Sequence, residues 1–422
     1  MTRTNPETPP TMPDDTANFI PRRRSLLAGG AGLLGGLLSR PAAAQTIPAW
    51  THEQGSPITS PPYGAPSPFE ARVIRRPRAS TPFPTAASSN APLQDLHGII
   101  TPAGLHYERH HAGVPQIDPD QHKLLIHGLV DRPLVLTLND LLRFPSVSRV
   151  HFLECSGNTG LWSGGKPEWT ALDTHGLLSC SEWTGVALST VLAEVGLQPE
   201  AKWILAEGAD GAAMTRSIPV EKALDDAILA YAQNGERLRP EQGYPLRLFL
   251  PGFEGNTSVK WLRRLKVGDQ PFDTREETSK YTDLLPDGRA NRFNFVMEVK
   301  SVVTSPSGGQ TLTDKGFREI TGLAWSGHGK IRRVEVSVDS GATWREARLQ
   351  EPVLSKALTR FRLPWNWQGE PALLASRATD EYGNVQPTHQ ALLAARGANY
   401  GYHYNAIHAW RLSADGRLTN AI

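Results

Sequence analysis

Short apolar runs separated by turn residues characterise positions 95–290 of this 422-residue chain. The pattern predicts a helix at 139–144, which Asn139 can cap, and another at 188–195. These helices do not alternate with strands as a doubly wound fold requires, so we expect one α+β domain. Short runs of apolar or alternating residues predict its strands at 123–130, 150–154, 203–207, 228–232 and 246–250.

The pattern changes in residues 291–422. A strand is expected at 331–338, where apolar and polar residues alternate from Val334 onward. A turn at 339–341 follows it, and a further strand is expected at 377–380. Strands and turns that repeat without helices predict a β-sandwich of the immunoglobulin type.

Residues 45–94 are rich in proline, serine and alanine and show no helical or strand period. They are expected to form an extended arm that precedes the folded domains. The arm carries a basic cluster, which is either a solvated surface or a strap across a partner subunit. The cluster consists of Arg72, Arg75, Arg76 and Arg78.

Residues 1–44 read as a targeting segment. Three arginines at 22–24 precede an apolar, glycine-rich stretch at 26–38, and small residues at 42–44 fit a cleavage site. The stretch is short for a bilayer span. It resembles a twin-arginine export signal, which predicts a periplasmic protein that acquires a cofactor before export. A basic N-terminal anchor helix is the alternative.

Charge and missing motifs exclude several function classes. Without residues 1–44 the chain has equal numbers of basic and acidic residues, so no basic footprint for a nucleic acid is expected. No later stretch is long and apolar enough to predict a membrane span. The glycine-rich nucleotide motifs and the CxxCH haem motif are absent. A haem that accepts electrons from this chain would therefore belong to another chain.

The best-presented reactive group is the thiol of Cys155. The predicted strand at 150–154 delivers it to a turn of small polar residues at 156–158. A thiolate there suits a metal or nucleophilic role, but a disulfide with Cys180, the second cysteine, has the same appearance. A thiolate also needs positive charge nearby, and the candidates are Arg109, Arg247, Lys260 and Arg396.

From about residue 95 the chain resembles the sulfite oxidase family of molybdenum enzymes. Cys155-Ser156-Gly157-Asn158 resembles the CxGN motif that carries the family's molybdenum-ligating cysteine. Further matching stretches occur in the family's order, namely Arg109-His110-His111, Glu207-Gly208-Ala209-Asp210, Gly243-Tyr244-Pro245-Leu246-Arg247, Val259-Lys260-Trp261, Tyr281, Asn384-Val385-Gln386-Pro387, Arg396-Gly397 and Ala409-Trp410.

The resemblance implies a molybdopterin-binding domain at 95–290 and an immunoglobulin-like dimerisation domain at 291–422. It implies molybdenum with molybdopterin as cofactor, Cys155 as the metal ligand and Cys180 as a free buried thiol. The implied catalytic residues are Arg109, Tyr281 and Arg396. The implied cofactor-binding residues are His110, His111, Ser156, Asn158, Asp210, Gln242, Arg247, Ser258 and Lys260.

Two departures from the family pattern bear on the substrate. Thr159 and Gly160 follow the CxGN motif where sulfite oxidases carry arginines, and Gln242 replaces an expected pterin histidine. With the segment 399–410, these features are most similar to the molybdenum subunits of periplasmic sulfane dehydrogenases. That branch implies oxidation of sulfane sulfur on a carrier protein's cysteine, with electrons passed to a c-type cytochrome subunit.

The same branch implies a homodimer through the C-terminal domain and a heterotetramer with the cytochrome. Two alternatives within the family are a cytochrome-linked sulfite dehydrogenase and a methionine-sulfoxide reductase, and the second lacks support because of the C-terminal sandwich. The alternative of another class is a metal-free periplasmic binding module held by a Cys155–Cys180 disulfide.

Overall fold

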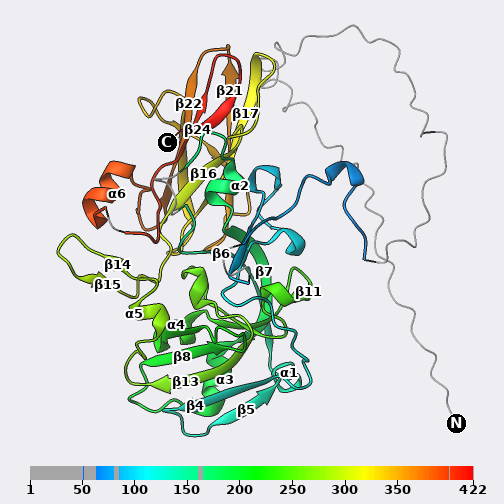
Figure 1. Cartoon of the computed structure of the whole chain (residues 1–422), viewed down its shortest axis with the longest axis vertical. Coiled ribbons are helices and arrows are strands. Elements are labelled where there is room, and N and C mark those ends of the chain that lie inside the picture. Colours follow the sequence, from blue (N-terminus) through cyan, green and yellow to red (C-terminus); the bar gives the residue numbers. More distant parts are fainter. Residues whose placement is uncertain (1–50, 52–62, 80–84, 160–164, 399, 422) are drawn as a thin grey trace, which may run out of the picture. The chain divides into compact units, whose positions relative to one another are not determined.

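The computed structural model describes residues 51, 63–79, 85–159, 165–398 and 400–421. The predicted signal at 1–44 lies outside them. The chain divides into two units, residues 1–63 and 64–422, and all that follows concerns the second unit. Figure 1 shows its elements in sequence colours.

Two five-stranded sheets form the first part of this unit. One has the order β11-β10-β7-β6, with β12 paired to β10. Its strands are β6 (Ser146–Glu154), β7 (Leu178–Ala187), β10 (Ile228–Gln233), β11 (Glu236–Arg237) and β12 (Arg247–Phe249). The other sheet, β5-β4-β13-β8-β9, pairs β4 with β13 in parallel. It comprises β4 (Lys123–Gly128), β5 (Leu134–Thr137), β8 (Trp203–Gly208), β9 (Thr215–Pro219) and β13 (Leu262–Gly268).

All five strands expected in this region are present, because each short apolar run has a partner strand. The helices are α1 (Leu138–Leu141), α2 (Ala171–His175), α3 (Leu188–Val195), α4 (Val220–Asp225) and α5 (Arg275–Thr278). The helix predicted at 188–195 is confirmed as α3. The helix predicted at 139–144 is wrong in its bounds and its cap. Thr137 caps α1 through a capping box with Asp140, and Asn139 lies inside the helix.

The predicted arm at 45–94 was expected to lack strands, and this is wrong for part of it. β1 (Arg76–Ala79) and β2 (Ala87–Asn90) form a three-stranded sheet with β3 (Glu108–Arg109). Polar residues fill these strands, so no apolar period signals them. Arg76 and Arg78 both reach Asp173 of the same chain. These two arginines thus have partners within the chain.

The C-terminal part is a sandwich of two antiparallel sheets. The first sheet is β16 (Lys300–Ser305), β17 (Gly316–Trp325), β21 (Thr359–Trp367) and β20 (Arg348–Leu349), in that order. The second is β19 (Arg345–Glu346), β18 (Ile331–Ser337), β22 (Ala372–Asp380), β23 (Ala409–Leu412) and β24 (Leu418–Ala421). The strands expected at 331–338 and 377–380 are confirmed as β18 and part of β22. The expectation of no helix is wrong, because α6 (His389–Arg396) precedes β23.

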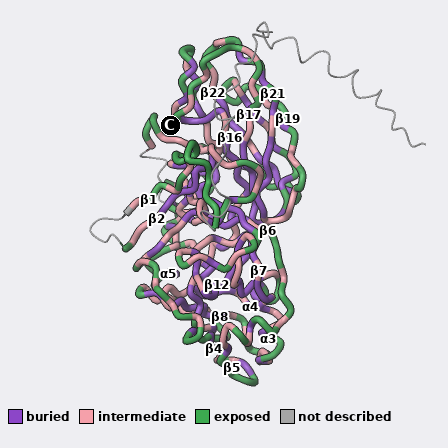
Figure 2. The backbone as a smooth tube through the Cα atoms, turned by 90° about the vertical axis from the view of Figure 1, so that its right-hand side faces the viewer, coloured by how far each residue is buried: buried purple, intermediate pink, exposed green. Residues whose placement is uncertain are grey.

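The region between the two parts contains the hairpin of β14 (Asp283–Leu284) and β15 (Ala290–Asn291). One apolar core runs from the first part into the sandwich. It joins Phe152 and Trp183 of the first part to Val302, Trp325 and Trp410 of the second. Figure 2 shows buried backbone along the strands of both parts. Burying each such side chain stabilises the fold by roughly 2 kcal/mol, so the shared core fixes one part against the other.

Gly322 of β17 is packed too closely for any side chain. A Cβ there would lie 2.2 Å from a ring carbon of Phe361 and 2.3 Å from the carbonyl oxygen of Val302. We expect Gly322→Ala to destabilise the protein by about 2 kcal/mol, because an overpacked core must shift backbone. Thermal unfolding followed by circular dichroism measures this. Gly401→Ala is the matched control, since a Cβ there meets nothing within 4 Å. Equal melting temperatures for the two variants would contradict the prediction.

Candidate active site

One pocket gathers most of the residues that the sequence nominated. Ten of the predicted site residues line it: Arg109, His110, His111, Cys155, Asp210, Gln242, Arg247, Ser258, Lys260 and Tyr281. Ser156, Asn158 and Arg396 do not line it. Trp261, part of the quoted stretch 259–261, also lines it. Sequence reasoning missed further lining residues, including Tyr107, Glu108, Met214 and Asn256. Tyr107 and Glu108 lie directly before the Arg109 motif, which was the available signal.

Cys155 follows the last residue of β6, as the sequence predicted. Its N–H donates to the carbonyl of Leu177 at 3.0 Å, and its carbonyl accepts from Asn158 N–H at 2.8 Å, which closes a tight turn. Burial raises the pKa of the Cys155 thiol, and the N–H of Gly157 opposes this rise. Cys155 and Cys180 are both free thiols, so the disulfide alternative is wrong.

A buried ion pair holds the strand end that presents this thiol. Glu154 and Lys300 are 0% and 1% exposed, and their Oε1 and Nζ atoms lie 3.0 Å apart. Trp325 Nε1 donates to the other carboxylate oxygen at 2.6 Å. Asn158 Nδ2 donates to Glu154 at 2.9 Å, and Lys300 donates to Thr159 Oγ1 at 2.9 Å. The sandwich thus supplies the lysine and the indole that fix the cysteine loop.

Ser156 and Asn158 shape this loop from outside the pocket lining. Asn158 Oδ1 accepts from Leu177 N–H at 3.2 Å. Ser156 Oγ accepts from Asn256 Nδ2 at 3.1 Å, and its carbonyl accepts from the N–H of His403 at 2.8 Å. Their predicted role as cofactor ligands therefore stays a prediction, while their contacts position Cys155.

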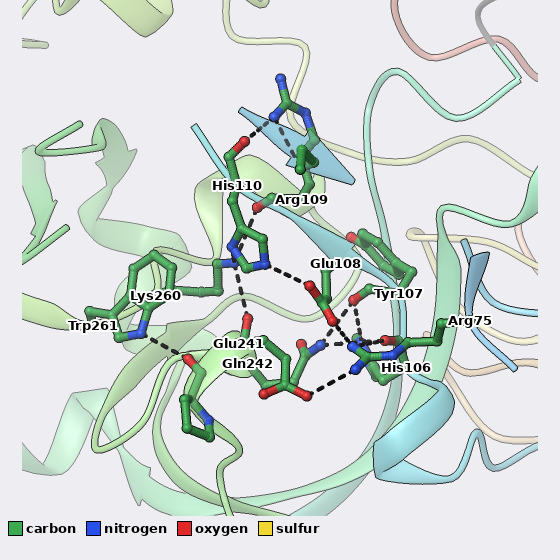
Figure 3. Close-up of polar contacts among 12 residues, drawn as sticks. Arg75, His106, Tyr107, Glu108, Arg109, His110, Glu241, Gln242, Lys260 and Trp261 are labelled. Atoms are coloured by element: carbon green, nitrogen blue, oxygen red, sulfur yellow. Dashed lines mark hydrogen bonds and ion pairs between the residues drawn. The ribbon is translucent and has the colours of Figure 1, made fainter. Parts of the chain in front are cut away.

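His110 lies at the centre of a polar network at the pocket wall (Figure 3). Lys260 Nζ donates to His110 Nδ1 at 2.8 Å, and His110 Nε2 donates to Glu108 at 2.9 Å. Burial and the charge of Lys260 lower the pKa of His110 to about 3, so the ring is neutral. Arg75 pairs with Glu108 and, at 3.2 Å, with Glu241. The network orients Lys260 towards the pocket.

Tyr281 and His111 form a second polar pair in the lining of the pocket. The Tyr281 hydroxyl lies 3.1 Å from His111 Nε2. Burial lowers the pKa of His111 to about 4 and raises that of Tyr281. A neutral imidazole therefore faces a protonated phenol, an arrangement that can orient a substrate or move one proton. Tyr281 has a φ of 54°, in the left-handed region that non-glycine residues occupy rarely and mostly at functional sites.

Three cations of the pocket have no acidic partner. Within the described ranges no carboxylate lies at ion-pair distance from Arg109, Arg247 or Lys260. Arg247 donates to the carbonyls of Gln242 at 3.0 Å and Ser258 at 2.9 Å. Its buried Nε has no hydrogen-bond partner among the described residues. Burial lowers the pKa of Arg247 to about 10 and that of Lys260 well below its usual value. Buried cations without a counter-charge are unfavourable, so the site suits an anionic group.

Comparisons with known proteins agree with this geometry. Residues 111–276 match the family model of the oxidoreductase molybdopterin binding domain, and 291–409 match that of the Mo-co oxidoreductase dimerisation domain. The crystal structure of the sulfane dehydrogenase SoxCD from Paracoccus pantotrophus is 48% identical, with a TM-score of 0.86 over 89% of this chain and 97% of that one. The chain belongs to the sulfite oxidase family.

More distant relatives are larger proteins. Mitochondrial sulfite oxidase of Rattus norvegicus is 31% identical across 78% of this chain and 65% of its own length. NADH nitrate reductase of Brassica napus is 34% identical across 71% of this chain and 38% of its own length. The chain therefore spans less than two thirds of each of these two relatives. The predicted α+β fold with a sandwich is confirmed.

The cofactor of this family member is molybdenum with molybdopterin, as predicted. The pocket fits it. Cys155 offers the soft thiolate that such a metal prefers, and the unpaired Arg247 and Lys260 suit the phosphate of the pterin. Asp210 accepts from the N–H of Met214 at 3.2 Å and so holds its own loop at the pocket. It can also accept from a ring N–H.

Sequence reasoning missed a chain of ionic side chains beside the pocket. His403 reaches Glu254 and Glu298 with its two ring nitrogens, each at 3.3 Å. Burial opposes the positive charge on His403, but hydrogen bonds to Glu254 and Glu298 raise its pKa to about 9. Glu298 in turn pairs with Arg396, which was expected to reach the substrate. Neither Glu298 nor Glu254 lies in a recognised motif, whereas His403 lies in the segment 399–410 that the sequence singled out.

No helix among the residues that the structure describes is long and apolar enough to cross a membrane.

Loss of the thiol should abolish metal loading. In Cys155→Ser a hydroxyl replaces the soft ligand, so we expect molybdenum per chain to fall at least about tenfold in protein produced with full cofactor supply. Elemental analysis of the purified protein measures this. Cys180→Ala, which removes the buried thiol of β7, is the control and should load like the wild type. Full loading of Cys155→Ser would disprove the ligand assignment.

The charge on His403 should make stability depend on pH. Its folded pKa of about 9 exceeds the usual 6.5, so its contribution is fully present below pH 6.5 and is lost as pH rises through 9. The shift corresponds to about 3 kcal/mol. The melting temperature of His403→Gln should therefore fall furthest below the wild type at pH 6 and approach it near pH 10. The exposed His328→Gln should follow the wild type throughout, and a pH-independent gap for His403→Gln would refute the assignment.

Proposed function

We propose that this chain oxidises sulfane sulfur carried as a cysteine persulfide on a carrier protein, in the oxidation of thiosulfate, and passes the electrons to a c-type cytochrome subunit. The observation that carries the proposal is the match to a sulfane dehydrogenase across 97% of that solved chain. The sequence supports it with Thr159, which stands where arginines are expected in sulfite oxidases.

The residues of the pocket have separate roles in the proposed reaction. The bound cofactor supplies two-electron oxygen-transfer chemistry at the metal. Cys155 holds the metal, while Arg247 and Lys260 hold the pterin phosphate. Among the described residues Arg109 donates hydrogen bonds only to carbonyls, those of Ala87 and His110, so its charge is available to stabilise negative charge that develops on the oxidised sulfur. These roles follow from position and charge.

Tyr281 and His111 complete the substrate side of the pocket. Their hydrogen bond places a phenol proton and a neutral imidazole at one wall. The neutral imidazole nitrogen can accept a hydrogen bond from the phenol and so fix the orientation of the phenol oxygen towards the substrate sulfur. The ring of Tyr402, in the C-terminal segment, lies 5.3 Å from the ring of Tyr281 and so packs beside this wall.

The proposed assembly follows the same branch of the family. We expect a homodimer through residues 291–422, and a heterotetramer once two cytochrome subunits bind. The match at 291–409 to a dimerisation domain supports the first contact. The twin-arginine-like segment at 22–44 supports export to the periplasm.

A cytochrome-linked sulfite dehydrogenase is the second candidate. Relatives that are named sulfite oxidases, including the human enzyme at 32% identity, favour it. Arg109 would serve free sulfite as well as it serves protein-bound sulfur. The two candidates therefore differ in which donor the pocket accepts.

Cytochrome reduction with two donors tests the proposal. The protein purified with its co-expressed cytochrome is mixed with free sulfite or with a carrier protein that bears a cysteine persulfide. We expect kcat/KM for the persulfide carrier to exceed that for sulfite by at least about a hundredfold, because the carrier adds protein contacts to the affinity. The unmodified carrier is the control. Efficient reduction by sulfite alone would establish the second candidate instead.

A further inference from the structure

Ionic side chains beside the pocket alternate in sign. Arg396 pairs with Glu298, and its Nη1 also donates to the carbonyl of His403 at 3.5 Å. Glu298 accepts from His403 Nδ1 at 3.3 Å. His403 Nε2 lies 3.3 Å from Glu254, which pairs with Arg216 at 2.9 Å. The order is therefore cation, anion, cation, anion, cation.

This series of ionic side chains ends at Arg216, which contacts the lining of the pocket. Arg216 contacts Asn256, a lining residue, and its guanidinium lies 5.4 Å from the ring centroid of Tyr281. Arg216 Nε also lies 3.7 Å from Glu277, so this last cation has two acidic neighbours. At the middle of the series, the N–H of His403 donates to the carbonyl of Ser156, the residue after Cys155.

The cations in and beside the pocket thus fall into two groups, which differ in whether a carboxylate binds them. Lys260 and Arg247, on the cofactor side, have carbonyl or imidazole partners and can offer their charge to an anion. Arg396, His403 and Arg216 lie beside the pocket without lining it, and each is bound to a carboxylate. A carboxylate at contact distance cancels most of the attraction that a guanidinium exerts on a third charge.

We propose that Glu298 is a specificity-determining residue, which binds Arg396 and so prevents the cations beside the pocket from attracting small free oxyanions. This rests on the proposed function, because it names what separates a carrier-borne donor from free sulfite. A free anion gains its affinity from charges in the pocket. A donor carried on a protein gains much of its affinity from contacts outside the pocket. It therefore needs less net positive charge beside the pocket.

The variant Glu298→Gln tests the proposal in the complex with its cytochrome. Loss of the carboxylate leaves the charge of Arg396 uncancelled, so the KM for sulfite and the dissociation constant of sulfate should both fall about tenfold. The KM for the persulfide carrier should change less than about twofold. Calorimetry measures sulfate binding independently of turnover. The matched control is Glu319→Gln, which breaks an exposed ion pair with Arg362 on the sandwich and should alter neither constant.

Two further variants establish the cause. Glu298→Gln combined with Arg396→Gln removes both charges, and the tenfold gain should disappear. His403→Gln keeps both carboxylates and removes one cation, so sulfate should bind at least about threefold more weakly than in the wild type. This opposite shift keeps the proposal testable even if Glu298→Gln does not fold or load molybdenum.

Unchanged sulfate binding in both Glu298→Gln and His403→Gln, with normal molybdenum content, would overturn the inference. That result is distinct from failure of the proposed function. The proposed function fails if the wild type prefers sulfite to the persulfide carrier, whatever Glu298→Gln does. The inference fails if the KM for sulfite and the dissociation constant of sulfate do not change when these charges are removed, whichever donor the wild type prefers.

Discussion

The buried pair of Glu154 and Lys300 determines where the metal ligand stands. Glu154 is the last residue of β6, and Lys300 is the first residue of β16, so the pair connects the pocket sheet to the sandwich. Burial lowers the pKa of Lys300, and Glu154 opposes this, so each charge depends on the other. Removing one partner of such a pair leaves an uncompensated buried charge, which is destabilising by several kcal/mol. The position of Cys155 is therefore a property of both domains together.

The cationic side chains around Cys155 form two groups. Arg109, Arg247 and Lys260 line the pocket and have no ion-pair partner among the described carboxylates, which suits an anionic cofactor and an oxidised sulfur. Arg396 and His403 are neutralised by glutamates. Backbone strain accompanies the arrangement, because Thr159, Trp261, Tyr281 and His403 all adopt left-handed φ values between 53° and 66°. Such conformations persist only where surrounding contacts impose them, and here they occur at the pocket and at the cysteine turn.

Local sequence was enough to find the elements that carry a strong pattern. α3 appears at its predicted residues because its apolar positions share one helical face. β1 and β2 escaped prediction because polar strands are held by backbone pairing, which leaves no apolar period. The start of α1 was misplaced, since its cap is Thr137, two residues before Asn139, in a capping box with Asp140. The motifs around Cys155, His110 and Lys260 located the pocket, because residues that contact one cofactor recur in short linear stretches.

The sequence by itself determined the strand end that presents Cys155, the sandwich, and ten of the residues that line the pocket. Each of these depends on neighbours in the chain or on a short motif. Only the tertiary structure determined which group pairs with Arg396. Its partner Glu298 lies 98 positions earlier, and Glu254, which completes the chain through His403, lies further still. Pairing between such distant residues leaves no local pattern, and it determines whether an arginine serves the substrate or a partly buried carboxylate.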